Sequence, residues 1–194
     1  MVSDMSTKIL GISASLRNAR RGLGNVDLIR DIKSLRNEEE LSSYLNQEAK
    51  IHLKNFQDSG RKSNATFDVL YKNLRKLKGD KGLSNSEILL VAALWSSYNL
   101  GSEIDHISLS EYFNEENEVL KIDELKSKII SSDGIIVSGP VYFGDRGSLA
   151  QAFINLMRED IELKKLIKNK VYAGCSVGAK RNGGQETLLV YQIW

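Results

Sequence analysis

The sequence predicts an α/β protein with a doubly wound parallel sheet, and three similar segments carry this prediction. Each segment is a short run rich in Ile, Val or Leu that ends in glycines or serines: residues 8–12, 135–137 and 171–177. Short apolar runs of this kind are typical of strands that are buried on both faces of a parallel sheet. Ligands of such sheets bind beyond the carboxyl ends of the strands, so we expect the three exits to share one crevice.

The exit after residues 135–137 has the most distinctive composition. Gly139 allows a sharp turn, and Pro140, the only proline of the chain, is expected to end the strand there. Two aromatic residues and two glycines follow, and Ser148 is then placed to cap a helix. Taken alone, this loop also fits an ordinary connection whose aromatic side chains only cover the core.

The exits of the other two strands contain small and polar residues. The first strand runs into Ser13, Ala14 and Ser15 and reaches the permanent cation of Arg17, a composition that suits an anion. The third strand runs into residues 178–184, which are rich in glycine and basic side chains, and a helical pattern starts at Gln185.

Together these residues resemble a known family. Residues 11–17 resemble the phosphate loop of the NAD(P)H-dependent FMN reductases, a flavodoxin-like group. Residues 139–144 resemble the isoalloxazine loop of that family, and residues 178–184 its third flavin-facing loop. The resemblance covers residues 7–17 and 83–193, and it implies a flavodoxin-like doubly wound sheet that binds FMN.

An insertion interrupts the resemblance after the first strand. The expected first helix begins only at Ser84, where Ser84 and Glu87 form the pattern of a capping box. Residues 18–81 are predicted to form three amphipathic helices with an excess of basic residues, as an inserted helical subdomain within a single domain of residues 1–194. A solvated helical face and a basic lid over an anionic cofactor are both compatible with that charge.

The resemblance implies a split site for the flavin phosphate, because family members carry a Ser-Asn-Thr-like triplet at the start of this helix. Free N–H groups and the helix dipole favour an anion there. The residues expected to hold the phosphate are Ser13, Ser15, Arg17, Ser84, Asn85 and Ser86. Those expected to flank the isoalloxazine are Pro140, Val141, Tyr142, Phe143 and Gly144, with Gly178, Gly183 and Gly184 approaching the ring.

The implied activity is that of an oxidoreductase in which FMN passes a hydride from NAD(P)H to a quinone or similar small acceptor. No catalytic acid or base is assigned, because the flavin itself carries the chemistry. Two other classes stay open, a flavodoxin-like electron carrier and a truncated module without flavin. A visible spectrum of the purified protein separates the last from the first two, and NAD(P)H turnover separates those two from each other.

Composition excludes several other classes. With a net charge of +2 over 194 residues, nothing indicates nucleic acid or a membrane surface as partner. The longest apolar run is too short to span a bilayer and the N-terminus lacks signal-peptide character, so we expect a cytoplasmic protein. The single cysteine, Cys175, excludes an internal disulfide, and it cannot supply the four thiolates of an iron–sulfur cluster. We expect no metal site.

The sequence also predicts a fold that appears shorter than its pattern requires. A sheet of order 2-1-3-4-5 needs one more strand and helix than residues 1–194 contain, and nothing follows to pair with the outer edge of residues 171–177. We therefore expect either a product truncated at its C-terminus or a homo-oligomer, with a dimer as the simplest form, in which a neighbour covers that edge.

The split phosphate site predicts a selective effect of Arg17→Ala. This change should weaken FMN binding more than riboflavin binding, at a cost of about 1.5–3 kcal/mol, because only FMN carries the phosphate. Equilibrium titration of both flavins measures the difference. Equal weakening of the two would place the phosphate elsewhere.

Overall fold

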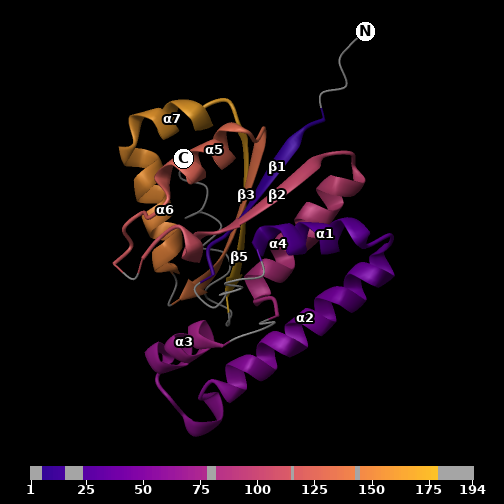
Figure 1. Ribbon diagram of the computed structural model, residues 1–194, viewed down its shortest axis with the longest axis vertical. Coiled ribbons are helices and arrows are strands. Elements are labelled where there is room, and N and C mark those ends of the chain that lie inside the picture. The colour runs from indigo at the N-terminus through magenta and orange to yellow at the C-terminus, as the bar shows by residue number, and fades with distance from the viewer. Residues whose placement is uncertain (1–5, 16–23, 78–81, 115, 143–144, 179–194) are drawn as a thin grey trace.

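The computed structural model describes residues 6–15, 24–77, 82–114, 116–142 and 145–178. Among the described residues, four helices follow the first strand in succession, and strands and helices then alternate (Figure 1). In chain order they are β1 (Lys8–Ser13), α1 (Gly24–Ser34), α2 (Glu38–Asp58), the 3₁₀ turn η1 (Arg61–Ser63), α3 (Phe67–Lys76), α4 (Asn85–Asn99), β2 (Glu103–Ser108), the 3₁₀ turn η2 (Leu109–Glu111), α5 (Ile122–Ile130), β3 (Gly134–Tyr142), β4 (Asp145–Arg146), α6 (Ser148–Glu159), α7 (Ile161–Ile167) and β5 (Val171–Gly178).

The sheet has the predicted parallel arrangement. Its parallel strands lie in the order β2, β1, β3, β5, and the short β4 pairs antiparallel with the end of β3. Strand β1 is central, and its Leu10 and Ile12 are fully buried. The predicted α/β class, a parallel sheet flanked by helices, is therefore confirmed.

Strand β3 is longer than the sequence predicted. We expected the chain to leave the sheet at Gly139, but β3 continues to Tyr142, and Pro140 stands opposite Val177 of β5. The reason is that β1 pairs with β3 only as far as Ser138, so the rest of β3 is free of β1, and proline is tolerated at such an edge. The expectation that Ser148 caps the next helix is wrong. Gly147 occupies the N-cap position, and Ser148 is the first residue of the helix.

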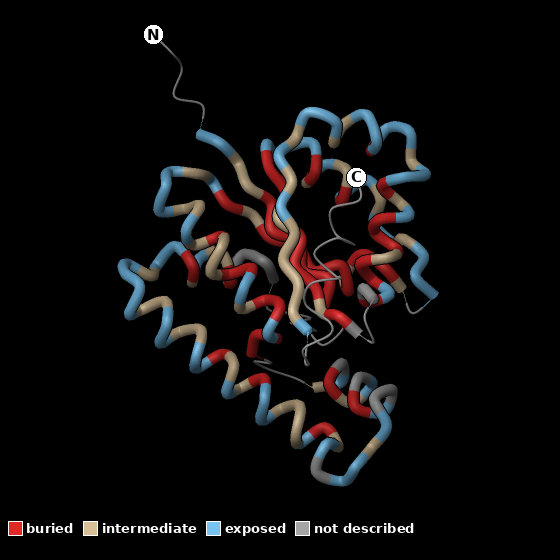
Figure 2. The backbone as a smooth tube through the Cα atoms, turned by 180° about the vertical axis from the view of Figure 1, so that it is seen from behind, coloured by how far each residue is buried: buried red, intermediate tan, exposed pale blue. Residues whose placement is uncertain are grey.

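Two helical layers cover the sheet. On one face, α5, α6 and α7 enclose a core that includes Phe153 and Met157. On the other face, α1 and α4 pack on Ile9, Ile104 and Ile136 of the sheet. Figure 2 shows the buried residues concentrated on the strands and on the inner sides of these helices.

The helices α1, α2 and α3 occupy the segment in which the sequence predicted three helices. Leu28 and Ile32 of α1 are buried against α4, and the Trp95 Nε1–H of α4 donates to the Leu35 carbonyl oxygen at 3.0 Å. Helix α2 runs obliquely past the end of the sheet at which β3 and β5 finish (Figure 1). Of these helices, α1 thus covers a face of the sheet, and α2 lies beside the end at which the predicted site is expected.

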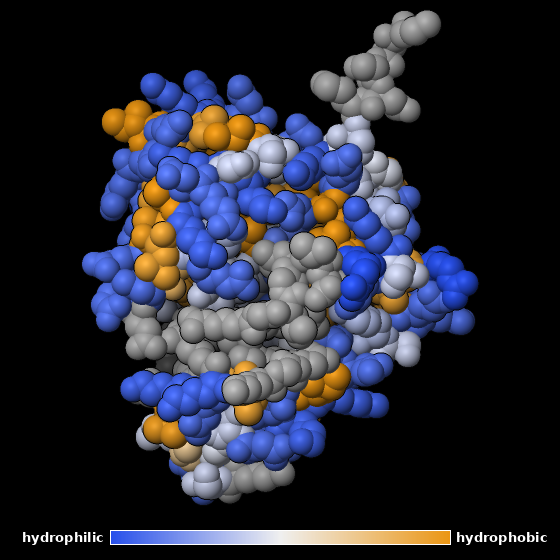
Figure 3. All heavy atoms as spheres, in the orientation of Figure 1, coloured by the Kyte–Doolittle hydropathy of each residue, from blue (hydrophilic) through white to orange (hydrophobic). Residues whose placement is uncertain are grey.

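The face seen in Figure 3 is largely hydrophilic over its described residues, with hydrophobic atoms gathered beside α6 and α7. Ile161, at the start of α7, is 71% exposed. In the described part of the chain, no helix has the length and apolarity needed to cross a lipid bilayer.

A glycine just before α4 packs closely against the backbone of α2. Gly82 has a φ of +65°, and a Cβ there would overlap the Glu48 carbonyl oxygen and the His52 backbone nitrogen of α2. The next residue, Leu83, donates its N–H to the same Glu48 carbonyl at 3.3 Å. Only glycine permits this backbone conformation and this close approach together.

The contact predicts that Gly82→Ala destabilises the protein more than an ordinary glycine replacement. Gly101 is the matched control, because its φ is +90° but nothing lies within 4 Å of a Cβ placed there. Replacing Gly101 should cost about 1–2 kcal/mol of backbone strain. Replacing Gly82 should cost at least ~2 kcal/mol more, because α2 must also move. Urea unfolding measures both, and equal losses would show that α2 does not lie against Gly82.

Candidate functional site

The four serines predicted to hold the phosphate gather where β1 ends and α4 begins. Ser13 and Ser15 come from the end of β1, and Ser84 and Ser86 from the first turn of α4. These four residues, called the serine cluster below, are each at most 4% exposed. Asn85, between the last two, is exposed. The structure thus brings together the two parts of the predicted site that it describes.

Hydrogen bonds join the two parts of the site across the insertion. The Ser13 hydroxyl donates to Glu87 Oε1 at 3.3 Å, although the two residues are 74 positions apart. Strand β3 bonds to both parts, because its Ser138 carbonyl accepts from the Ala14 N–H at 2.8 Å and its hydroxyl donates to the Ser86 carbonyl at 2.6 Å. The end of β1, the end of β3 and the start of α4 therefore form one buried polar unit.

Glu87 lies within this unit and is only 1% exposed. The predicted capping box is present, with the Ser84 N–H donating to Glu87 Oε2 at 2.9 Å. The same oxygen accepts the Ser84 hydroxyl at 2.8 Å, and the Ser84 and Ser86 hydroxyl oxygens are 3.3 Å apart. From the sequence, Glu87 had only a capping role. Its bond to Ser13 depends on the tertiary fold, and no local pattern indicates it.

The predicted isoalloxazine loop begins beside the same unit. Pro140 and Val141 lie near the end of β3, and Tyr142 ends the strand. Gly178 ends β5 directly opposite Val141, so the second and third predicted loops leave the sheet as neighbours. The remaining predicted site residues lie outside the described part of the chain: Arg17, Phe143, Gly144, Gly183 and Gly184.

Helix α2 contributes two buried polar residues that the sequence did not assign to the site. Glu48 and His52 are 6% and 8% exposed, and their backbone lies against Gly82 and Leu83, which lead into the serine cluster. The contact with Gly82 could not be foreseen, because it joins segments that only the fold brings together.

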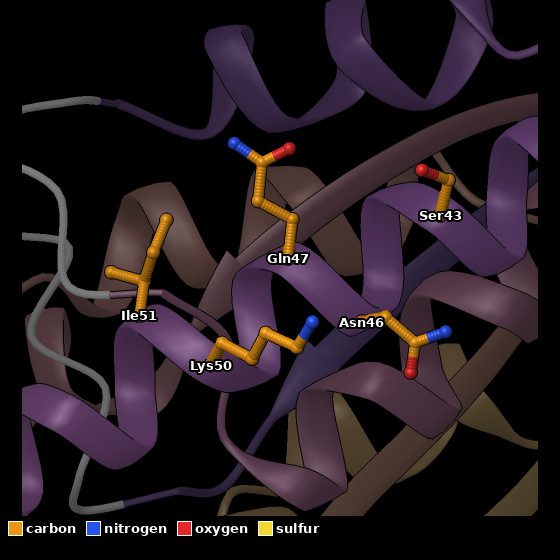
Figure 4. Close-up of a pocket in the computed structure, with 5 residues that line it drawn as sticks. All are labelled: Ser43, Asn46, Gln47, Lys50 and Ile51. Atoms are coloured by element: carbon orange, nitrogen blue, oxygen red, sulfur yellow. The ribbon is translucent and has the colours of Figure 1, made fainter.

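A surface pocket lies along another face of α2 (Figure 4). It is lined by side chains at helical spacing: Ser43, Asn46, Gln47, Lys50 and Ile51. None of these residues belongs to the predicted site. The pocket therefore does not contribute to the assignment of the site.

Cys175 of β5 stands opposite Ser138 of β3. Burial raises the pKa of its thiol above the ordinary value, which keeps it protonated at neutral pH. Within the described residues, no group of three or more His, Cys, Asp or Glu side chains is placed to hold a metal ion.

A parallel sheet of this order, with serines from the end of its first strand beside serines from a helix N-terminus, is consistent with a flavodoxin-like α/β protein. The model of the NADPH-dependent FMN reductase family matches residues 80–191, more than half of the chain. The chain belongs to this family. The predicted family is thereby confirmed, and FMN is the cofactor that membership supports, which places the chain among flavin-dependent redox proteins.

Two curated relatives are similar to part of the chain. An iron-sulfur flavoprotein of Methanosarcina thermophila is 35% identical over 125 residues, which are 54% of this chain and 62% of the relative. An iron-sulfur flavoprotein of Methanocaldococcus jannaschii is 38% identical over 68 residues, 35% of each chain. The chain thus spans less than two thirds of the length of either relative.

An iron–sulfur cluster, which the names of these relatives include, does not fit the residues of this chain. Clusters of this kind are held by cysteine thiolates, usually four of them. The 194 residues contain one cysteine, and it lies in a strand with a thiol that burial keeps protonated. Serine hydroxyls beside a helix N-terminus, by contrast, are groups of the kind that suit a phosphate.

Burial of Cys175 predicts slow alkylation. The thiolate is the reactive form, and a raised pKa lowers the thiolate fraction at any pH below it. Iodoacetamide should therefore react with Cys175 at pH 8 at least ~10-fold more slowly than with an unstructured cysteine peptide, and the rate should rise as the pH is raised. Mass spectrometry follows the reaction. A rate equal to that of the peptide would contradict this description of the thiol.

Proposed function

We propose that this chain is an FMN-dependent oxidoreductase that passes a hydride from NAD(P)H through bound FMN to a quinone or a similar small acceptor. The family supports the flavin and, by its description, the reductant. The single observation that carries the proposal is the serine cluster, in which two parts of one predicted phosphate site meet at the carboxyl ends of β1 and β3. That edge is where ligands of doubly wound sheets bind.

In this proposal the serine cluster and Asn85 hold the phosphate, together with Arg17. The residues at the ends of β3 and β5, from Pro140 onward and from Gly178 onward, flank the isoalloxazine. When bound, FMN supplies the redox chemistry by accepting a hydride and passing electrons on. The chain's own residues bind and orient the cofactor, and no side chain is assigned as a catalytic acid or base.

The organisation of the chain belongs to the same proposal. Residues 1–194 form one domain, and residues 18–81 are a helical insertion in the phosphate loop. Strand β5 pairs on one side with β3, and no other described strand pairs with its opposite side. A second copy of the chain covering that edge is the form of oligomer that we propose.

A one-electron FMN carrier is the second candidate. The two relatives are named as flavoproteins and not by a nicotinamide-dependent reaction, which favours this alternative. The two candidates share the flavin site and differ in whether NAD(P)H reduces the bound flavin directly.

The test uses the purified full chain. FMN should bind at least ~10-fold more tightly than riboflavin, because charge-assisted bonds to the phosphate are worth about 1.5–3 kcal/mol each. NADPH or NADH should then bleach the bound flavin near 450 nm, and a soluble benzoquinone should restore the colour. Bleaching by dithionite but not by either nicotinamide would favour the carrier.

A matched pair of variants tests the location of the phosphate. Ser86→Ala should weaken FMN binding about 10-fold and leave riboflavin binding unchanged. Ser132→Ala should change neither affinity, because Ser132 precedes β3 at the end of the strand opposite to the serine cluster. It is a matched control, since Ser132 is also buried and its hydroxyl also donates to a carbonyl, that of Ile129, at 2.8 Å. Equal effects of the two changes would remove the serine cluster from the flavin site.

A further inference from the structure

Glu87 accepts the hydroxyl protons on which phosphate binding would depend. Its carboxylate accepts the Ser13 hydroxyl at 3.3 Å and the Ser84 hydroxyl at 2.8 Å. A serine hydroxyl has one proton, and an ionised carboxylate can only accept. In this arrangement neither Ser13 nor Ser84 can donate to a phosphate while it donates to Glu87.

The third hydroxyl of the set depends on the same carboxylate. Since Ser84 gives its proton to Glu87, the contact of 3.3 Å between the Ser84 and Ser86 hydroxyls is satisfied with Ser86 as donor. The Ser86 proton then points toward the Ser84 oxygen, and Ser84 in turn donates to Glu87. The carboxylate thus organises the hydroxyl protons of Ser13, Ser84 and Ser86 in the way that a bound anion would.

A phosphate bound at the serine cluster would be a second anion sharing donors with a carboxylate that is 1% exposed. Two anions that share a buried site cannot both stay ionised without a large cost, and the usual result is that one takes up a proton. The phosphate group of FMN is already a dianion at pH 8, because the second pKa of a phosphate monoester is about 6. Glu87 is therefore the group that can relieve the repulsion.

We infer that Glu87 takes up one proton from solvent when FMN binds. Once Glu87 is protonated, the serine hydroxyls that donated to its carboxylate can donate to the phosphate instead. The new carboxyl O–H donates to the Ser13 or Ser84 oxygen, and that serine directs its own proton to the phosphate. The inference rests on the proposed function, because it assumes that FMN phosphate binds at the serine cluster. It makes Glu87 a determinant of specificity for a phosphorylated flavin.

Other titratable groups border this site. Helix α2 contributes Glu48 and His52, both buried beside Gly82 and Leu83. The adjoining ends of β1 and β3 contribute the uncharged hydroxyls of Ser13, Ser15 and Ser138, and Arg17, the expected cation, lies outside the described residues. The test must therefore distinguish Glu87 from Glu48 and His52, and from the phosphate itself.

The experiment is isothermal titration calorimetry of FMN binding to the full chain at pH 8, in buffers of different ionisation enthalpy, which counts the protons taken up. We expect about one proton for FMN and none for riboflavin. In Glu87→Gln, which keeps an acceptor for the Ser84 N–H and carries no charge, we expect no proton uptake. The variants Glu48→Gln and His52→Gln should keep the uptake of the native protein.

The affinity should follow the same linkage. Binding that takes up one proton weakens about 10-fold for each pH unit, so the dissociation constant for FMN should rise ~10-fold from pH 8 to 9 in the native protein. It should stay level in Glu87→Gln, which should bind FMN more tightly than the native protein at pH 9. Riboflavin affinity should not follow this pattern in either protein.

Three results would overturn the inference. Tight, phosphate-selective FMN binding without proton uptake would do so and leave the proposed function intact, and this readout needs no variant. Uptake that persists in Glu87→Gln would assign the proton to the phosphate or another group, and uptake lost only in Glu48→Gln or His52→Gln would assign it to α2. Failure to bind FMN in preference to riboflavin would overturn the proposed function and the inference together.

Discussion

The structure depends on one constraint, that Ser13 and Glu87, which are 74 positions apart, must meet in one buried polar unit. The buried hydrogen bond from Ser13 to Glu87 fulfils it. The bonds of Ser138 to Ala14 and Ser86 attach β3 to the same unit. Helix α4 also approaches β1 closely, because a Cβ at Gly11 would lie only 2.7 Å from Leu94 Cδ1. A buried hydroxyl or carboxyl group without a partner is costly, so the hydrogen bonds within this unit stabilise the meeting of its parts.

The proposed insertion is compatible with this constraint because its described helices α1 and α2 pack against the rest of the protein. Helix α1 buries Leu28 and Ile32 beside α4. The backbone of α2 at Glu48 and His52 lies against Gly82, just before α4. Contact with α2 therefore holds Gly82 and Leu83, the two residues that lead into the serine cluster. A change in α2 can reach the serine cluster through two residues, Gly82 and Leu83, which links the inserted helices to the proposed cofactor site.

Much of the fold could be predicted, because local patterns determine it. The apolar runs that became β1, β3 and β5, the capping box of Ser84 and Glu87, and the helical periodicity of the insertion are all visible in short windows of sequence. The length of β3 could not be predicted, because Pro140 is tolerated only once β1 has ended. The contacts of Glu87 with Ser13 and of Gly82 with α2 join distant segments and have no local signal. The roles assigned to all the predicted site residues remain predictions, and Arg17, Phe143, Gly144, Gly183 and Gly184 lie outside the described residues.

The most direct test of this account is a crystal structure of the full chain with FMN. The account predicts phosphate oxygens within hydrogen-bond distance of groups from both parts of the loop, at Ser13 or Ser15 and at Ser84, Asn85 or Ser86, with Gly82 still packed on α2. A phosphate held by only one part, or bound away from the end of β1, would contradict the claim that the insertion divides a single phosphate site.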